Sequence, residues 1–321
     1  MEQTLIETHK LRPKDGESFD IIIIGAGPAG MSAAVCAGRA RLKVLILERA
    51  LPGGQASTGY HISNYLGFPK GILGEKLALQ MEAQLEDFPL HYSREVVEDI
   101  LNSGADSKTI KTDMGNTYHA KGIIIATGLE PRRLNMDFET TFRGRGVSYY
   151  AQGDGASYQD KDVAVIGGGN CACYAADYLS EKVNHLYLVH RSDSLKAVKA
   201  LKEKVMSNPK ITVIWNSELT DAFGIDKIEK IKITNRLNDQ HTWLDVKAIF
   251  VYVGRIPPKE ILHLNLQTDE NGYIITDEYM RTSIRGVYAA GDIRSKQIRQ
   301  IATAVSDGMI AAINVERDIL R

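Results

Sequence analysis

Apolar runs that end in glycine-rich turns organise this chain. The first set consists of a buried parallel strand, a glycine turn, a helix and a second strand, predicted at residues 19–24, 25–30, 31–41 and 43–47. The second strand ends in Glu48. This order is typical of a dinucleotide site, because the glycines admit a pyrophosphate at the helix N-terminus and the acid accepts hydrogen bonds from the ribose.

The same pattern recurs further along the chain. Its strand, glycine turn, helix and next strand are predicted at residues 162–166, 167–172, 174–180 and 185–189. His190 stands where Glu48 stands in the first copy, so no carboxylate is present there for a free ribose 2′-hydroxyl. Arg191 follows, and a guanidinium suits a phosphate better. The second site is thus expected to favour NADPH over NADH, or to hold a ligand anchored in another way.

Further strand ends indicate the domain boundaries. Ala126-Thr127-Gly128 closes one strand, residues 250–254 close another, and a later strand enters Gly291-Asp292. One dinucleotide-binding domain therefore appears within the other in sequence order. We predict an α/β fold with two Rossmann-like three-layer domains, formed by residues 1–129 with 254–321 and by residues 130–253.

Composition then excludes several classes of protein. The chain has 321 residues, of which 44% are hydrophobic and 25% charged, as in an ordinary globular protein. A net charge of −1 gives no electrostatic reason to bind nucleic acid or an anionic membrane. No window approaches the roughly 18 apolar residues of a membrane span, and the first twenty residues do not resemble a secretory signal. We therefore expect a cytoplasmic protein, and no metal site is predicted.

Taken together, the motifs resemble those of class II pyridine nucleotide-disulfide oxidoreductases, in particular the low-molecular-weight thioredoxin reductases. The markers follow in order from Phe19: the turn at 25–30, residues 52–55, Asn64, 126–128, 167–172, 289–292 and 299–301. The resemblance implies that residues 1–129 and 254–321 bind FAD and that residues 130–253 bind NADPH or a similar dinucleotide. It also implies a homodimer that pairs through the FAD domains.

The resemblance assigns roles to individual residues. The expected FAD ligands are Gly25, Gly27, Gly30 and Glu48 for the adenosine diphosphate half, Gly54, Gln55 and Asn64 for the isoalloxazine, Gly291 and Asp292 for the ribityl chain or its phosphate, Arg299, Gln300 and Ile301 for the pyrimidine edge, together with Val97, Thr127 and Gly128. The second dinucleotide would contact Gly167, Gly169, Asn170, His190, Arg191, Tyr149 and Tyr150. Donors near the pyrimidine edge stabilise a reduced flavin.

Two departures from the family matter. Members carry a CxxC motif before the second dinucleotide strand, but Tyr150 and Gly153 replace both cysteines here, while the acid that follows is kept as Asp154. Ordinary thioredoxin reductase chemistry at that motif is therefore excluded. In the family the phosphate cradle has a further arginine after the equivalent of Arg191 and another farther on. This chain has Ser192 and Lys196 at those positions.

Cys171 and Cys173 lie at the second glycine turn and suggest relocated redox chemistry. A thiol at a helix N-terminus has a lowered pKa, although residues two apart on a regular helix point about 160° apart. The alternative is that Cys173 packs against the sheet and Cys171 replaces a small residue. Tyr149 and Tyr150 either stack on a second FAD or pack as ordinary strand residues.

The leading hypothesis is a flavin-dependent disulfide oxidoreductase that acts through Cys171 and Cys173, with Asp154 transferring protons near the sulfur. NADPH or a second FAD would occupy the second site, and a thioredoxin-like or small disulfide would be the acceptor. The alternative is an electron-transfer flavoenzyme without thiol chemistry, similar to ferredoxin–NADP⁺ reductases. Ferredoxin is a possible donor in either case. A binding module that keeps FAD as a structural ligand is the third class.

Overall fold

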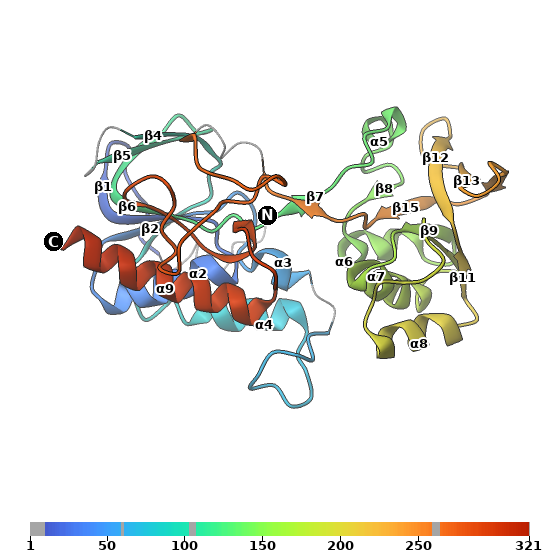
Figure 1. The fold of residues 1–321 in the computed structure, drawn as a ribbon, viewed down its shortest axis with the longest axis horizontal. Helices are drawn as coiled ribbons and strands as arrows, with labels where there is room; N and C mark the ends of the chain where they lie inside the picture. The colour runs from blue at the N-terminus through green and yellow to red at the C-terminus, as the bar shows by residue number, and fades with distance from the viewer. Residues whose placement is uncertain (1–9, 59–60, 103–106, 259–263, 321) are drawn as a thin grey trace. The chain divides into compact units, whose positions relative to one another are not determined.

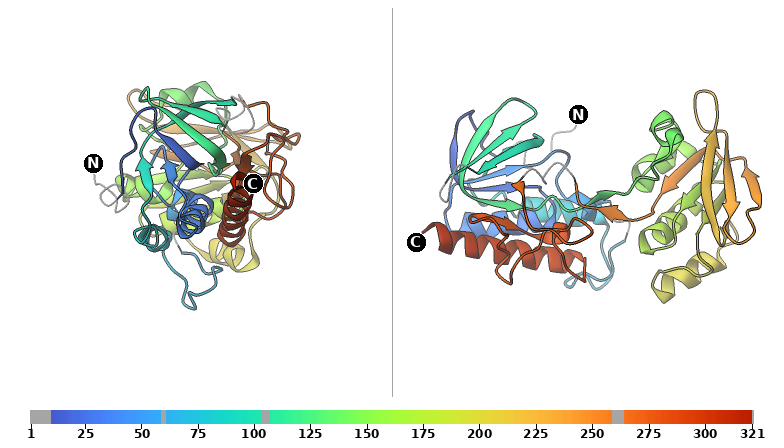
Figure 2. Two further views of the ribbon diagram at one scale, coloured as in Figure 1. Left: turned by 90° about the vertical axis from the view of Figure 1, so that its left-hand side faces the viewer. Right: turned by 45° about the horizontal axis from the view of Figure 1, so that its top comes forward.

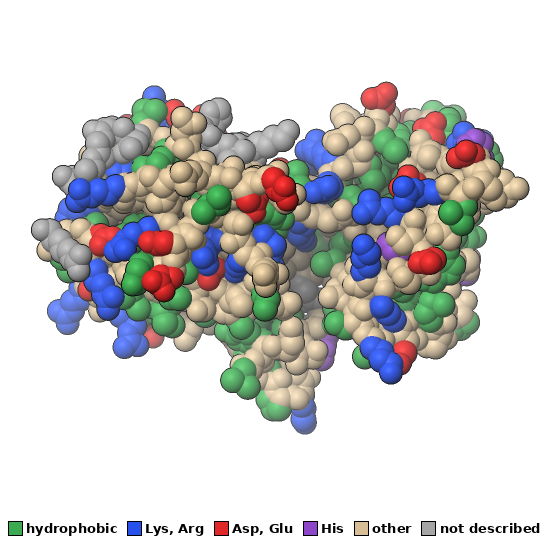
Figure 3. All heavy atoms as spheres, viewed as in Figure 1, with side chains coloured by type: hydrophobic (Ala, Val, Ile, Leu, Met, Phe, Trp, Pro, Cys, Tyr) green, Lys and Arg blue, Asp and Glu red, His purple; other side chains and the backbone are tan. Residues whose placement is uncertain are grey.

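The protein is described by a computed structural model that covers residues 10–58, 61–102, 107–258 and 264–320. The chain divides into two compact units, one formed by Met1–Glu130 with Ile256–Arg321 and the other by Pro131–Arg255. Both units have α/β architecture (Figure 1). The α/β, doubly Rossmann-like prediction is therefore confirmed. On the face viewed in Figure 3, acidic and basic side chains are interspersed over the first unit.

The first unit is built on a mixed seven-stranded sheet with the order β3-β2-β1-β6-β5-β4, and β17 pairs with β6. Its strands are β1 (Ser18–Ile24), β2 (Val44–Leu47), β3 (His91–Ser93), β4 (Val97–Asn102), β5 (Lys108–Thr112), β6 (Thr117–Ile125) and β17 (Val287–Ala289). Strands β1, β2, β3, β6 and β17 run parallel, whereas β4, β5 and β6 form antiparallel pairs. The inner strands are apolar on both faces because both faces are covered.

The helices of the first unit are α2 (Pro28–Arg39), α3 (Gly54–Ser57), α4 (Gly74–Ala83) and α9 (Ile301–Ile319), with a short 3₁₀ helix at Gly291–Ile293. Helices α2 and α9 pack side by side against one face of the sheet (Figure 2). A methyl group placed at Gly308 would lie 2.0 Å from the carbonyl oxygen of Ala29. Glycine at this position therefore allows the two helices to approach closely.

The second unit contains a parallel five-stranded sheet with the order β11-β10-β9-β15-β8. Its strands are β8 (Val147–Ser148), β9 (Asp162–Ile166), β10 (His185–Val189), β11 (Ile211–Ile214) and β15 (Ala248–Val251). The chain also forms a two-stranded sheet of β7 (Glu130–Pro131) and β16 (Arg255–Ile256). The predicted strands 162–166 and 185–189 coincide with β9 and β10.

Two different layers cover this sheet. One face packs against helices α6 (Ala151–Asp154), α7 (Asn170–Ser180) and α8 (Lys199–Ser207), with a 3₁₀ helix at Gly155–Tyr158. The other packs against α5 (Asp137–Thr141) and an antiparallel sheet of β12 (Ser217–Phe223), β13 (Lys230–Asn235) and β14 (His241–Leu244). The apolar residues of β9 alternate between the two cores, which fixes its register.

Two details differ from the sequence-based expectations. Helix α2 ends at Arg39, two residues before the predicted end, because Arg41 adopts a left-handed conformation with φ of 59°. Helix α7 already begins at Asn170, so the cysteine pair lies inside a helix. Within the part of the chain that the structure describes, no helix has the length and apolarity of a membrane span.

Candidate dinucleotide sites

The first glycine turn allows backbone segments to approach too closely for any side chain. Gly25 has φ of +106°, and a methyl group there would lie 2.5 Å from the carbonyl oxygen of Ala126. A methyl group at Gly30 would lie 1.8 Å from the carbonyl oxygen of Gly25. These contacts hold the start of α2 directly against β1 and β6. Gly27 is the N-cap of α2, has no side-chain cap, and precedes a proline.

Glu48 is fixed at the end of β2 beside this turn. Its side chain is buried, and its two oxygens accept hydrogen bonds from the amides of Ala26 at 2.6 Å and Ala50 at 2.8 Å. A carboxylate held by two backbone donors has a defined direction. The remaining lone pairs can accept hydrogen bonds from ribose hydroxyls, as the motif requires.

Residues far apart in sequence meet near the second part of this site. The Gln55 side-chain amide donates to the carbonyl of Leu129 at 3.1 Å and lies close to Gly128. The side chain of Asn64 donates to that of Gln300 at 2.9 Å. A methyl group at Gly54 would lie 3.1 Å from the Cα atom of Gly27, so these backbones nearly touch. These contacts bring Gly54, Gln55 and Gly128 together and join Asn64 to Gln300. Val97 is the first residue of β4 and takes part in none of these contacts.

Beside Gly291, the structure reveals an ion cluster that the sequence analysis did not identify. The Gly291 amide donates to Asp307 at 3.0 Å, and the same carboxylate pairs with Arg294 and Lys296, each at 2.8 Å. Asp307 is almost fully buried on α9. In the sequence, only the position of Asp307 within a largely apolar helical stretch could have indicated this cluster. The cluster supports the turn before Asp292, where a ribityl or phosphate contact is expected.

Arg299 is held in place by an aromatic ring and a backbone carbonyl. Its guanidinium lies 3.9 Å from the ring centre of Tyr273, and its Nε donates to the carbonyl of Asp292 at 3.3 Å. Gln300 is the N-cap of α9, and Ile301 is the first residue of that helix. The predicted pyrimidine-edge residues thus lie together at a helix N-terminus, the end that stabilises negative charge.

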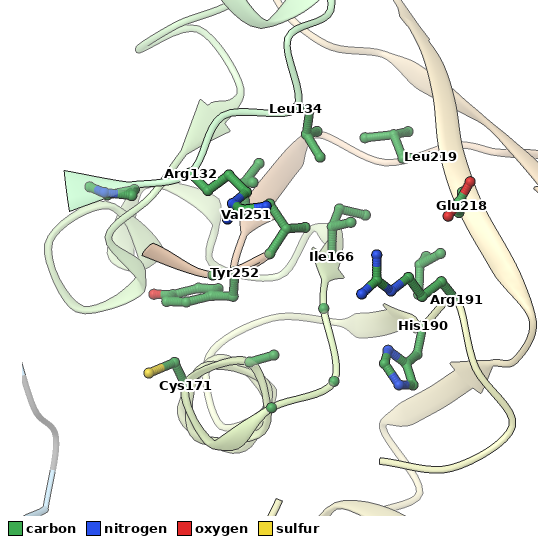
Figure 4. Close-up of a pocket in the computed structure, with 18 of the residues that line it drawn as sticks. Arg132, Leu134, Ile166, Cys171, His190, Arg191, Glu218, Leu219, Val251 and Tyr252 are labelled. Atoms are coloured by element: carbon green, nitrogen blue, oxygen red, sulfur yellow. The ribbon is translucent and has the colours of Figure 1, made fainter. Parts of the chain in front are cut away.

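The second glycine turn lines a cavity of about 550 Å³ (Figure 4). The cavity opens at the carboxyl ends of β9, β10 and β15, where ligands bind in open parallel sheets. Predicted residues that line it are Tyr149, Gly167, Gly169, Asn170, Cys171, His190 and Arg191. Lining residues that the sequence analysis did not assign include Arg132, Arg133, Glu218 and Tyr252.

Within this turn, Gly167 lies against the backbone of a neighbouring segment, whereas the space next to Gly169 is open. A methyl group at Gly167 would lie 2.3 Å from the carbonyl oxygen of Tyr252, whereas one at Gly169 would have no neighbour within 4 Å. The loop after β10 is fastened to the turn, because the Lys196 amide donates to the Gly168 carbonyl at 2.7 Å. The side chain of Asn170 accepts from the Val198 amide at 2.9 Å. Asn170 therefore shapes the site through this loop.

His190 closes the floor of the cavity. A methyl group at Gly168 would lie 2.3 Å from the His190 ring, and the ring's Nε2 lies 3.1 Å from the Ser194 carbonyl oxygen. Burial lowers the pKa of His190, and the charges of Arg191 and Lys196 lower it further. The imidazole is therefore neutral near pH 7, and the positive charge of the segment after β10 comes from Arg191 and Lys196.

The structure separates the two predicted tyrosines. Tyr149 lines the cavity, and its hydroxyl donates to the buried carboxylate of Glu139; burial and that hydrogen bond raise its pKa. Tyr150 instead packs over Gly153, where a methyl group would lie 2.4 Å from the ring. With the Tyr150 ring in this position, only glycine fits at residue 153. Only Tyr149 has the location expected for stacking on a cavity ligand.

The cysteine pair is divided between the two faces of α7. Cys171 is exposed and lines the cavity, whereas Cys173 is completely buried in the core beneath the sheet. Burial raises the pKa of Cys173 to about 11. Both thiols are free, and the regular first turn of α7 keeps them on different faces. The burial of Cys173 argues against thiol–disulfide exchange at this residue. The proposed redox pair of Cys171 and Cys173 stays a prediction.

Asp154 is the last residue of α6 and is exposed. Its carboxylate accepts a hydrogen bond from the Ser148 hydroxyl at 2.6 Å, and Ser148 in turn accepts one from the Tyr150 amide at 2.9 Å. The acid is therefore anchored in the segment that corresponds to the family's CxxC region. This local network gives it a structural role as well.

Comparison with known proteins identifies the family. Residues 19–308 match the model of pyridine nucleotide-disulphide oxidoreductases. A thioredoxin reductase from Listeria innocua is 40% identical over 301 residues, 93% of each chain. The structure of Lactococcus lactis thioredoxin reductase is 39% identical, with a TM-score of 0.90 over 94% of this chain and 99% of that one. A ferredoxin-flavin thioredoxin reductase from Clostridium acetobutylicum is 29% identical, with a TM-score of 0.51 over 95% and 99%.

The chain therefore belongs to the pyridine nucleotide-disulphide oxidoreductase family. Within it, the protein is a flavin-dependent oxidoreductase of the thioredoxin reductase type that lacks the CxxC cysteines. FAD and NAD(P)H are the cofactors typical of this family.

The residues of the first unit fit FAD. Gly27 and Gly54 leave the start of α2 open to a pyrophosphate, and Glu48 is oriented for a ribose. Among the described residues, the buried hydroxyl of Thr127 has no hydrogen-bond partner. A buried polar atom of this kind is normally paired, so a ligand in the predicted place would supply what it lacks.

Proposed function

We propose that this protein is an FAD-dependent oxidoreductase whose first unit binds one FAD and whose second unit binds a nicotinamide dinucleotide as the electron donor. The cavity at the second glycine turn is the observation that carries this proposal. It combines a turn open to a pyrophosphate at Gly169 with the cations Arg191 and Lys196 at the place expected for adenosine. This arrangement supports NADPH or NADH more directly than a second FAD.

The basic side chains are the reason for preferring a nicotinamide nucleotide. Arg191 and Lys196 line the cavity next to the segment that follows β10, where the adenosine ribose of a Rossmann ligand lies. Their charges attract a 2′-phosphate, which NADPH carries and FAD does not. Tyr149 supplies an aromatic wall that suits either ligand. The measured ratio of FAD to polypeptide separates the two: about one supports the nicotinamide proposal, and about two supports a diflavin enzyme.

For the acceptor, we propose a thioredoxin-like or small disulfide that reacts at Cys171. This thiol is exposed, and Cys171 lies in the first turn of α7 and lines the cavity, so a disulfide can reach it from solvent. Cys173 is part of the same hypothesis, but its burial and raised pKa support it less. Asp154, held by Ser148, is the proposed proton carrier.

The variant Cys171→Ser tests the acceptor proposal. We expect turnover with disulfide acceptors to be lost, while FAD content and reduction of the flavin by NAD(P)H persist. The matched control is Cys36→Ser, which replaces a half-buried thiol on α2 in the other unit. Undiminished disulfide turnover by Cys171→Ser would overturn the thiol role.

A second candidate is electron transfer without thiol chemistry, with ferredoxin as donor or acceptor. The replacement of both CxxC cysteines by the packed pair Tyr150 and Gly153 favours it. The similarity to the Clostridium acetobutylicum ferredoxin-flavin enzyme is consistent with ferredoxin as a donor in either scheme. Rapid mixing with reduced ferredoxin, NADPH and NADH would rank the donors. A homodimer through the FAD-binding units is proposed from the family resemblance.

A further inference from the structure

The cavity at the second glycine turn is lined by a carboxylate next to the segment after β10, where the adenosine ribose of a Rossmann ligand lies. Glu218, on β12, lines the cavity on the same side as Arg191 (Figure 4). At the end of β10 the sequence places His190, so the usual ribose-binding acid is missing there. The fold supplies an acid from a different strand instead.

Backbone hydrogen bonds fix the position of this acid. The Ser217 amide donates to the His190 carbonyl at 3.0 Å, and the Asn216 amide donates to the Ser192 carbonyl at 3.2 Å. The start of β12 is thus attached directly to residues 190–192. Glu218 follows at once, so its placement next to Arg191 does not depend on a flexible loop.

A guanidinium also links the two positions. Nε of Arg236 lies 3.4 Å from the Glu218 carboxylate, and its Nη1 donates to the Arg191 carbonyl at 3.5 Å. The Glu218 side chain is 48% exposed, so this pair is solvated and leaves carboxylate oxygens available to a ligand. On the side of the cavity formed by residues 190–196, the lining therefore combines two cations, Arg191 and Lys196, with the negative charge of Glu218.

We propose that Glu218 is a specificity-determining residue of the nucleotide site, and that its carboxylate lowers the preference for NADPH over NADH that Arg191 and Lys196 create. The inference rests on the proposed nucleotide site in the second unit. A 2′-phosphate carries close to two negative charges, and Glu218 repels it. A free 2′-hydroxyl can instead donate a hydrogen bond to the same carboxylate.

The test measures binding of NADP⁺ and NAD⁺ to the oxidised, FAD-loaded protein by calorimetry, so it does not depend on turnover. Glu218→Gln is expected to tighten NADP⁺ binding about two- to five-fold, the range of a solvated charge pair. It should leave NAD⁺ binding unchanged or weaker. The control is Glu229→Gln, which removes the same charge from an exposed position of the second unit outside the cavity lining.

The outcomes separate the two proposals. If wild type binds NADP⁺ and Glu218→Gln leaves the ratio of the two affinities unchanged, this inference is wrong and the nucleotide site stands. An equal shift in Glu229→Gln would show a general charge effect and would also overturn it. If wild type binds neither nucleotide, the proposed donor site itself fails, and the role of Glu218 fails with it.

Discussion

Replacing Gly169 by alanine separates ligand binding at the second site from folding. Gly169 has φ of −87° and ψ of −178°, a conformation that alanine adopts without strain. The added methyl group would have no protein atom within 4 Å, so we expect thermal unfolding and FAD content to match wild type. The methyl group would instead occupy the space through which a pyrophosphate reaches the N-terminus of α7.

The expected loss follows from the hydrogen bonds at this position. Displacing a phosphate from even one helix-terminal amide removes a charge-assisted hydrogen bond of about 1.5–3 kcal/mol. We therefore expect NADP⁺ and NAD⁺ to bind about 10- to 100-fold more weakly to Gly169→Ala. Both nucleotides should lose affinity equally, because both carry the same pyrophosphate.

The equivalent glycine of the first turn is the matched control. A methyl group at Gly27 would meet only the Cα atom of Gly54, at 4.0 Å. Gly27→Ala should thus reduce FAD retention and leave nucleotide binding to the second unit intact. The assay titrates each variant calorimetrically and measures released flavin after denaturation. Nucleotide affinities of Gly169→Ala within two-fold of wild type would refute the assignment of this turn.

Further predictions concern individual side chains. With a thiol-reactive probe at pH 7, Cys171 should react fastest, while Cys173, whose pKa is raised to about 11, should react only after unfolding; equal rates in mass spectra would contradict its burial. Glu48→Gln should lower FAD retention and reduce the free energy of unfolding by about 1–3 kcal/mol, because one of the two backbone amides loses its carboxylate acceptor. An unchanged unfolding temperature and flavin content would contradict this. Folding lowers the pKa of His190, so the unfolded chain takes up a proton at a higher pH than the folded chain. The free energy of unfolding should therefore fall as the pH drops below about 6.5. In calorimetric scans, His190→Gln should flatten this part of the stability–pH profile.

The strands and turns of both units could be predicted because they follow local rules. Residues 162–166 and 185–189 are apolar after their first residues, Asp162 and His185, and the structure forms β9 and β10 over the same ranges. The ends of α2 and α7 differ from the predicted ranges. The left-handed conformation of Arg41 and the early start of α7 depend on how the chain turns, and apolar periodicity does not record this.

Contacts between distant residues were the part that sequence patterns could not supply. Glu218 lies on a strand without a motif, and only its pairing beside residues 190–192 brings it to the cavity. The packing of Tyr150 over Gly153 likewise needs side-chain positions in space. For Cys171 and Cys173, helical geometry already indicated opposite faces, and the structure places one thiol in solvent and the other in the core.

The most direct test of the account is an anaerobic titration of the purified protein with NADPH and NADH, combined with its flavin content. We predict about one FAD per chain and loss of the flavin absorbance with about one equivalent of nucleotide. About two FAD per chain, with a flavin that neither nucleotide reduces, would contradict it.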